Sequence, residues 1–402
     1  MQNPSSLFLR GTRVIDPYDR RDVVADVAID QGRFVEQAPK DAKIIDAAGC
    51  IVCPGLMDIH VHLREPGQGH KETIETGTRA AAAGGFTYVA CITRGRAGKE
   101  LTDFASLRAA GAVAFSDDGE GVEDDAVMAA AFEQAGRCDA LLIQHCEFKS
   151  LSAGGVMHLG EISRRLGLPG LDPRSEEAMI ERDLDLCRKT PARYHVAHIS
   201  TARAIELVRR AKAEGLPVTT EVCTHHLILT DEACASADPN TKMHPPLRPQ
   251  ADVDACRQGL LDGTIDCIVT DHAPHAAAEK ALGFLKAPAG IVGLETALGL
   301  AAKAMVETGM ADWPRLLHWF TTGAAAVVRR AARPIQVGSE ADLTIIDPIR
   351  EWTVDTQKLH SRSTNTPFGG AQLSGFVIGT IRGNRSCSAN LGSDTRKLYP
   401  PI

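Results

Sequence analysis

The sequence has no run of about eighteen or more apolar residues, the length needed to span a bilayer. Residues 1–10 lack the basic start and apolar core of a secretory signal. No block of basic residues interleaved with aromatic residues is present, and the net charge of −7 argues against a nucleic-acid partner. We therefore expect a cytoplasmic protein that neither crosses a membrane nor binds nucleic acid.

The spacing of the cysteines matches neither a disulfide framework nor a zinc finger. The eleven cysteines are scattered along the chain, and several, including Cys146, Cys223 and Cys267, fall in or next to expected strands. We expect them to be buried free thiols.

The two ends of the chain differ from its middle. Short strands separated by turns are expected in 7–52 and again in 335–385. This pattern suggests a small β-sandwich-like domain assembled from 1–52 plus 335–402. A larger domain would then occupy 53–334, which fits a chain of 402 residues.

In the middle, strands and helices alternate, which predicts a parallel sheet with helical crossovers. The expected strands are 55–61, 86–92, 112–116, 140–145, 193–198, 217–223 and 265–270. The expected helices are 71–83, 101–110, 124–136, 174–189, 202–214, 251–262 and 294–308. A parallel barrel closes with eight strands, so the alternation is one strand short. The gap follows Cys91, because no helix intervenes before Glu100.

The stretch Asp58-Ile-His-Val-His-Leu-Arg-Glu-Pro-Gly67 closes the first of these strands. Side chains alternate along a strand, so His60 and His62 project to the same side. Two imidazoles held in this way can share one metal ion, although an isolated pair is as often two hydrogen-bonded surface histidines. Arg64 adds a cation with a bidentate fork beside them.

Four later strands also end in residue types that bind metals. They end in Ser116-Asp-Asp-Gly119, His145-Cys-Glu147, His195-Val-Ala-His198 and Asp271-His-Ala-Pro-His275. Functional groups of a parallel barrel collect at the carboxyl ends of its strands. The polar residues at any one strand end could be capping residues. Five strands that all end in such residues, the first strand included, are hard to explain by capping. We expect two divalent ions that a carboxylate can bridge.

Alternation along the strands narrows the choice of ligands. Asp117 and Asp118 point to opposite faces if their strand persists, so one is the ligand and the other anchors the turn at Gly119. His198 is nearer the end of its strand than His195, and we take it as the ligand.

Together these motifs resemble those of dihydroorotases in the amidohydrolase superfamily. The resemblance extends to Lys242-Met-His-Pro-Pro-Leu-Arg248, Gly290-Ile-Val-Gly-Leu-Glu-Thr296 and Asn365-Thr-Pro-Phe368. It implies an α/β fold, a (β/α)8 TIM-type barrel with a terminal β-domain. It also implies the reversible cyclisation of N-carbamoyl-L-aspartate to L-dihydroorotate in pyrimidine biosynthesis. A homodimer and association with aspartate transcarbamoylase are further expectations.

Carried over residue by residue, the resemblance implies two zinc ions per chain. It assigns the more buried ion to His60, His62 and Asp271, the second ion to His145 and His198, and the bridge to Asp117. In sister branches a carbamylated lysine forms that bridge. Asp271 would also act as general acid and base, moving a proton between a metal-bridging hydroxide and the departing ring nitrogen.

The resemblance places Arg64, His275, His244 and Gly290 at the substrate. Arg64 and His275 would hold a substrate carboxylate, which neutral cyclic imides lack, so an allantoinase or hydantoinase-type amidohydrolase is the less favoured alternative. His244 departs from the family, which usually has asparagine or another residue at this position.

A second departure follows Cys91. Dihydroorotases continue there with Met-Pro-Asn-Thr, a helix and a third strand, whereas Ile92-Thr-Arg-Gly95 resembles the exit of that third strand. Either the protein lacks this unit and its substrate-binding asparagine, or residues are missing from the sequence. We favour the second, because an open barrel exposes strand edges and core. If the protein truly lacks this unit, a second alternative function is favoured, that of a non-catalytic scaffold for aspartate transcarbamoylase.

Overall fold

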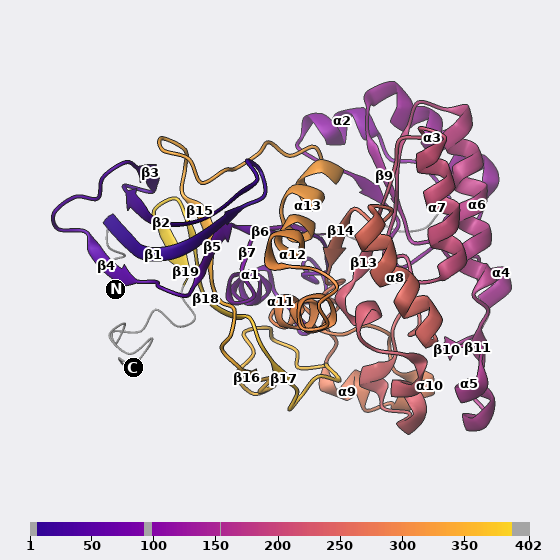
Figure 1. The fold of residues 1–402 in the computed structure, drawn as a ribbon. Coiled ribbons are helices and arrows are strands. Elements are labelled where there is room, and N and C mark those ends of the chain that lie inside the picture. Colours follow the sequence, from indigo (N-terminus) through magenta and orange to yellow (C-terminus); the bar gives the residue numbers. More distant parts are fainter. Residues whose placement is uncertain (1–5, 92–98, 153, 388–402) are drawn as a thin grey trace.

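The structure is a computed structural model that describes residues 6–91, 99–152 and 154–387. Seven parallel strands form the centre of its larger part, each at an expected position (Figure 1). They are β6 (Leu56–Val61), β7 (Phe86–Cys91), β8 (Phe115–Ser116), β9 (Leu141–Gln144), β12 (Arg193–Val196), β13 (Val218–Cys223) and β14 (Cys267–Val269). Five of them pair in the order β14-β13-β12-β9-β8, and β6 pairs with β7. A bridge between Val61 and His272 links the two groups.

This order is the one expected for a parallel barrel that is interrupted between β7 and β8. Within the described ranges, no strand pairs with the outer edge of either. A cavity of about 340 Å³ lies beside them and is lined mainly by apolar side chains, among them Phe104, Leu107 and Phe115. The strand shortfall expected after Cys91 therefore corresponds to an open seam, and the described residues do not form a closed barrel.

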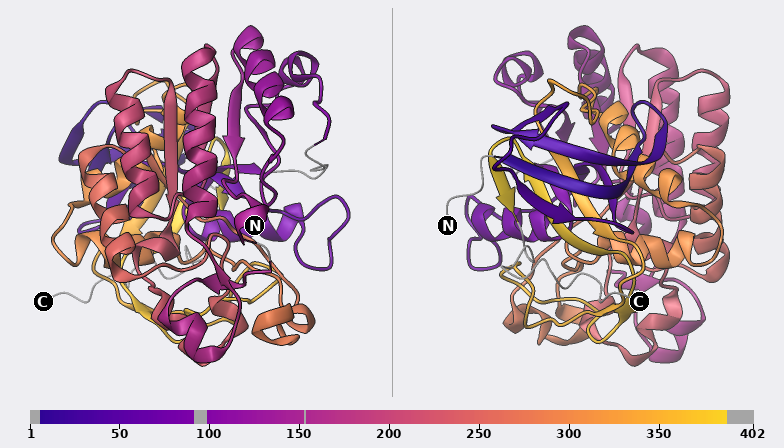
Figure 2. Two further views of the ribbon diagram at one scale, coloured as in Figure 1. Left: turned by 90° about the vertical axis from the view of Figure 1, so that its right-hand side faces the viewer. Right: turned by 60° about the vertical axis from the view of Figure 1, so that its left-hand side comes forward.

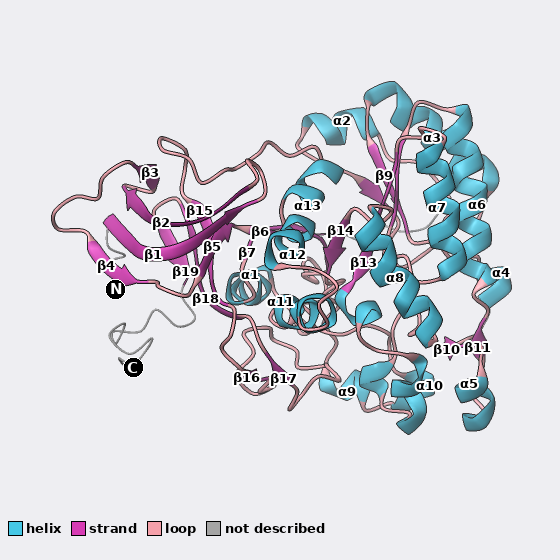
Figure 3. Ribbon diagram, in the orientation of Figure 1, coloured by secondary structure: helices cyan, strands magenta, loops and turns pink. Residues whose placement is uncertain are grey.

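Helices cover the outer side of these strands (Figure 3). The main ones are α1 (Ile74–Ala83), α2 (Phe104–Ala109), α3 (Asp125–Cys138), α6 (Arg174–Lys189), α7 (Ala202–Ala213), α8 (Gln250–Asp262), α12 (Trp313–Phe320) and α13 (Thr322–Val327). The helix expected over 294–308 is divided into α11 (Ala297–Ala301) and a π-helical turn, η4 (Ala302–Val306). Thr73, Asp124 and Thr201 begin their helices by accepting hydrogen bonds from backbone N–H groups. None of the described helices is long and apolar enough to cross a membrane.

Short elements fill the loops at the carboxyl ends of the strands. They are α4 (Lys149–Ser152), α5 (Glu161–Leu166), α9 (Ala277–Lys280), α10 (Gly283–Lys286), η1 (Thr224–Leu227), η2 (Asp231–Ser236), η3 (Pro239–Thr241) and the paired strands β10 (Met157–His158) and β11 (Gly170–Leu171). The long loops at 237–249 and 273–293 thus contain structure of their own. They pack over the same end of the molecule as the candidate ligands described below.

Strands from both ends of the chain form one eight-stranded sheet, seen from its own side in the right view of Figure 2. The order is β19-β18-β15-β5-β1-β2-β3, with β4 paired to β1. Its members are β1 (Ser6–Asp16), β2 (Arg21–Asp30), β3 (Arg33–Val35), β4 (Lys43–Asp46), β5 (Ile51–Pro54), β15 (Asp342–Asp347), β18 (Phe376–Arg382) and β19 (Arg385–Cys387). β16 (Trp352–Thr353) and β17 (Gln372–Leu373) form a separate ribbon.

Ten of the cysteines, those from Cys50 to Cys267, are free thiols, and eight of these ten are buried. Cys50 and Cys53 have the Cys-x-x-Cys spacing at β5. Their side chains belong to different apolar clusters, Cys50 to that of the small sheet and Cys53 to that between strands and helices. The strand therefore keeps these two thiols apart.

The open seam predicts uneven protection from amide hydrogen exchange. We expect amides on the outer edges of β7 and β8 to exchange at least about tenfold faster than those of β12 and β13, because their N–H groups lack a neighbouring strand. Exchange read by mass spectrometry would check this. Equal protection of all four strands would show that the seam is closed in solution.

Candidate metal centre

Two histidines of β6 and its following loop converge on two carboxylates from other strands. His60 Nε2 and His62 Nε2 lie 3.3 and 3.2 Å from Asp118 Oδ2, and 3.6 and 3.1 Å from Asp271 Oδ1. Ligand atoms placed tetrahedrally about 2.0–2.1 Å from one ion are about 3.3 Å apart. The four side chains therefore have the spacing of a metal site. His60 Nε2 is buried without a hydrogen-bond partner among the described atoms, as an atom reserved for a cation would be.

A second set lies on the other side of Asp118. His145 Nδ1 and His198 Nε2 are 2.9 Å apart, and Asp118 Oδ1 lies 3.7 and 3.2 Å from them, respectively. Asp118 therefore presents one carboxylate oxygen to each histidine pair. This is the position of a bridging ligand between two ions.

The shared carboxylate is Asp118, and the expectation of Asp117 is corrected. Phe115 points outward and stacks on Phe104 of α2, with ring centroids 4.1 Å apart. Alternation then places Asp117 on the same side as Phe115 and turns Asp118 inward, which agrees with the contacts of Asp118 with both histidine pairs. Phe115 was the residue in the sequence from which the inward orientation of Asp118 could have been predicted.

Three of the residues assigned to the site have left-handed backbone conformations. The φ angles of Arg64, His198 and Asp271 are +61°, +32° and +47°. Non-glycine residues adopt such angles at a cost of about 1–3 kcal/mol, and only where the surroundings hold them.

Glu221 on β13 was not predicted as a site residue. Its Oε1 lies 2.5 Å from His60 Nδ1, and its Oε2 lies 3.0 Å from His195 Nε2. A carboxylate on the far nitrogen of an imidazole fixes the tautomer and the orientation of the ring. His195 is therefore a partner of Glu221, and His198 occupies the metal-facing position. The sequence feature that could have identified Glu221 is a single glutamate inside a buried strand.

Asp58 ties the first strand to the last. Its Oδ1 accepts a hydrogen bond from the His60 N–H at 3.0 Å, and its Oδ2 accepts from Thr270 N at 3.2 Å and Oγ1 at 2.5 Å. Burial raises the pKa of Asp58 to about 7 despite these donors. The contacts hold β6, which carries His60, beside the loop that carries Asp271.

Electrostatics favour charged carboxylates at the centre. Burial opposes the charge on Asp118, but His60, His145 and His198 outweigh it and hold the pKa of Asp118 well below its usual range. Burial likewise opposes the charge on Asp271, and the neighbouring His62 and His60 lower its pKa. Ionised carboxylates are the form that binds metal ions.

His244 lies next to the second histidine pair. Its ring stacks on that of His145 with centroids 4.8 Å apart, and its Nε2 lies 2.6 Å from Glu147 Oε2. Glu147 also lies 3.6 Å from His145 Nε2. Glu147 therefore orients His145 and His244 together.

Arg64, His275 and Gly290 gather around Asn365. The Arg64 guanidinium lies 3.4 Å from His275 Nε2 and donates to the Pro274 carbonyl. Asn365 Oδ1 accepts from the His275 N–H at 3.0 Å, and its Nδ2 donates to the Gly290 carbonyl at 3.1 Å. Gly290 has φ +110°, and an added Cβ would lie 2.6 Å from that of Ala273, so only glycine fits.

Burial and the charge of Arg64 lower the pKa of His275 to about 3, so its ring is neutral at neutral pH. The neutral His275 therefore adds no positive charge beside Arg64.

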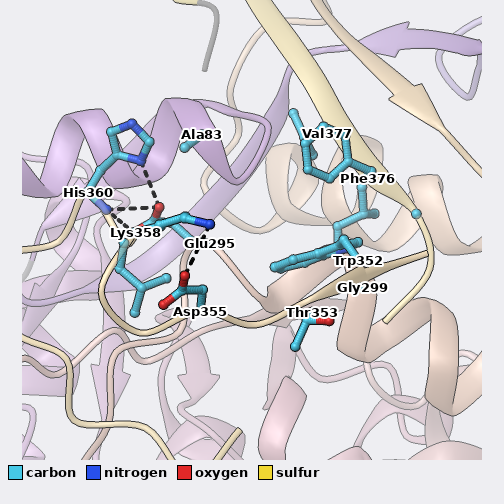
Figure 4. Close-up of a pocket in the computed structure, with 13 residues that line it drawn as sticks. Ala83, Glu295, Gly299, Trp352, Thr353, Asp355, Lys358, His360, Phe376 and Val377 are labelled. Carbon is cyan, nitrogen blue, oxygen red and sulfur yellow. Dashed lines mark hydrogen bonds and ion pairs between the residues drawn. The ribbon is translucent and has the colours of Figure 1, made fainter. Parts of the chain in front are cut away.

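A separate cavity of about 370 Å³ lies between the small sheet and the helices (Figure 4). Trp352 and Phe376 stand on one side of it, and Glu295 and His360 on the other. His360 Nδ1 lies 2.9 Å from Glu295 Oε2. No residue of the six-ligand centre lines this cavity, so it is distinct from the candidate site.

Comparisons with known proteins agree with the motifs. The family model described as Dihydro-orotase-like matches residues 49–95 and 88–204. The curated dihydroorotase of Elusimicrobium minutum is 43% identical over 94% of this chain and 96% of that protein. The dihydroorotase of Solibacter usitatus is 45% identical over 93% of this chain and 96% of its own length. In fold, the crystal structure of dihydropyrimidinase from Brevibacillus agri is similar, with a TM-score of 0.82 at 24% identity, covering 95% of this chain and 94% of that chain.

The alignment with the first relative is longer than the part of this chain that it covers. It spans 414 positions but covers 94% of the 402 residues, about 378, so about 36 positions have no counterpart in this chain. One strand with its helix and connections has about that length, since a βαβ unit takes about 30 or more residues. The two family-model matches meet at the end of β7, beside the open seam.

Replacing Glu221 with Gln should weaken metal binding without unfolding the protein. The amide keeps the volume of the carboxylate but removes the charge that orients His60, and losses of outer-sphere partners cost about 10–100-fold in metal affinity. Zinc dissociation constants from competition with a chromophoric chelator would measure the change. Glu206→Gln, on the exposed side of α7, serves as control. Equal affinities for both variants would contradict the positioning role.

Proposed function

This chain belongs to the dihydroorotase family, and we propose that it cyclises N-carbamoyl-L-aspartate to L-dihydroorotate, and reverses that reaction, at the centre around Asp118. Relatives named dihydroorotase at 43–45% identity over nearly the full length support this activity. The observation that carries the proposal for the site is the carboxylate of Asp118, which faces one histidine pair with each oxygen.

The centre fits two divalent ions, with zinc as the proposed metal. His60, His62 and Asp271 would hold one ion and His145 and His198 the other, with Asp118 between them. When bound, such ions lower the pKa of water from about 15.7 to about 7 and polarise an amide carbonyl. The donor set of imidazoles and carboxylates is one that zinc accepts.

Asp271 is the proposed general acid and base. Its carboxylate is held ionised and lies 3.1 Å from His62 Nε2, at the end of β14 where the other ligands converge. An ionised carboxylate in this place can accept the proton of an attacking water and pass it to the departing ring nitrogen. In the biosynthetic direction, the same proton returns through Asp271.

Arg64 is the proposed contact for the substrate carboxylate. It is a fixed cation beside the centre, and Pro274 and the neutral His275 surround it. An acidic ring would bring a carboxylate to this guanidinium, and an uncharged hydantoin or dihydropyrimidine has no such group. This favours dihydroorotate over the neutral rings named for the structural neighbours. His244 and Gly290 are proposed to line the same space.

The open seam favours a second candidate function. Within the described ranges, β7 and β8 each lack a paired strand on their outer edge, and the substrate-binding asparagine expected from the family has no counterpart after Cys91. A chain that retains its metal ligands but positions substrate poorly would act as a scaffold for aspartate transcarbamoylase. This partner and a homodimer remain predictions from the family resemblance.

Steady-state ring opening of dihydroorotate tests the proposal. Arg64→Ala should cost about 2–5 kcal/mol of substrate binding, because the substrate carboxylate loses its partner in a desolvated site. The loss should appear mainly in KM. Arg79→Ala, on the exposed side of α1, is the matched control and should match the wild type.

Turnover of dihydrouracil in place of dihydroorotate, unaffected by Arg64→Ala, would contradict the acidic substrate. Wild-type protein that is loaded with zinc yet shows no ring opening would support the scaffold function instead.

A further inference from the structure

Cys223, His225 and His226 form a second group of metal-binding side chains at the turn from β13 into η1 (Thr224–Leu227). One potential ligand atom from each residue lies within 4.8 Å of the others, and all three residues are buried. None of them is among the six ligands proposed for the catalytic centre. We call this group the β13 cluster.

Hydrogen bonding determines which nitrogen of His226 is available. His226 Nε2 lies 3.2 and 3.3 Å from the carbonyl oxygens of Pro245 and Pro246. A carbonyl only accepts hydrogen bonds, so Nε2 carries the proton and Nδ1 keeps its lone pair. This arrangement, with a carbonyl on the far nitrogen, is the one that orients metal-bound histidines.

One ring nitrogen of each histidine has no hydrogen-bond partner among the described residues. Nδ1 of His226 and Nδ1 of His225 are both buried, and neither has a hydrogen-bond partner among the described residues. The side chains are 2% and 3% exposed, so bulk water does not reach them freely. Leaving a buried polar atom unsatisfied costs about 1–3 kcal/mol in proteins. Two such atoms in one turn, beside a thiol, point to a ligand that they share.

We propose that the β13 cluster is a third cation site, for a borderline-soft divalent metal such as Zn²⁺. Thiolate and imidazole are the ligands that zinc prefers, and three protein ligands leave one tetrahedral position for water. On binding, the proton of the Cys223 thiol passes to the buffer and its sulfur becomes the ligand. The site is independent of the proposed activity, because it uses none of the catalytic ligands.

Cobalt substitution distinguishes this site from the catalytic centre. The six ligands proposed for the centre are imidazoles and carboxylates, so only a site with a cysteine can give a thiolate-to-Co²⁺ charge-transfer band in the near ultraviolet. We expect the full-length protein to show this band, and Cys223→Ser to lose it. Cys146→Ser, which removes a buried thiol outside the cluster, and His62→Ala, which damages only the catalytic centre, should keep it.

X-ray absorption of the zinc-loaded wild type gives a test that does not depend on the folding of any variant. We expect a zinc–sulfur distance of about 2.3 Å beside the nitrogen and oxygen shell. A shell of nitrogen and oxygen alone would overturn the proposal. A cobalt band of unchanged intensity in Cys223→Ser would overturn it as well, because the thiolate would then come from elsewhere.

Discussion

The whole site depends on one buried carboxylate. Asp118 is 2% exposed, and burial alone would oppose its charge. The imidazoles of His60 and His62 on one side and of His145 and His198 on the other compensate that cost, and metal ions would do so further. Because these groups come from the ends of four different strands, the strands must hold their positions within about 0.5 Å.

β8, which ends two residues before Asp118, is also the strand with the least support from neighbouring strands. β8 has two residues, pairs only with β9 among the described strands, and borders the open seam. The stack of Phe115 on Phe104 and the hydrogen bond from Asp118 N to Ser116 Oγ, at 2.9 Å, hold it in place. By contrast, His60 is supported by Asp58 and by Glu221, which lies on β13, a strand that is paired on both sides. Of the proposed metal ligands, His60 is therefore held by hydrogen bonds to two carboxylates, whereas Asp118 depends on packing against α2.

Much of this could be predicted from the sequence. The alternation of expected strands and helices located all seven parallel strands, and the shortfall after Cys91 corresponds to the seam. The choice between Asp117 and Asp118 failed, because it followed the family resemblance rather than the alternation set by Phe115. Glu221 was missed because its role depends on contact with His60, 161 residues away, which no local pattern reveals. The division of the helix near 302 was missed for a similar reason, since it arises within the packed chain.

Anomalous diffraction at the zinc edge, from crystals of the zinc-loaded protein, tests the central claim most directly. The account predicts two neighbouring peaks with the carboxylate of Asp118 between them, His60, His62 and Asp271 around one, and His145 and His198 around the other. A single peak in this centre, or a pair bridged by any group other than Asp118, would contradict it.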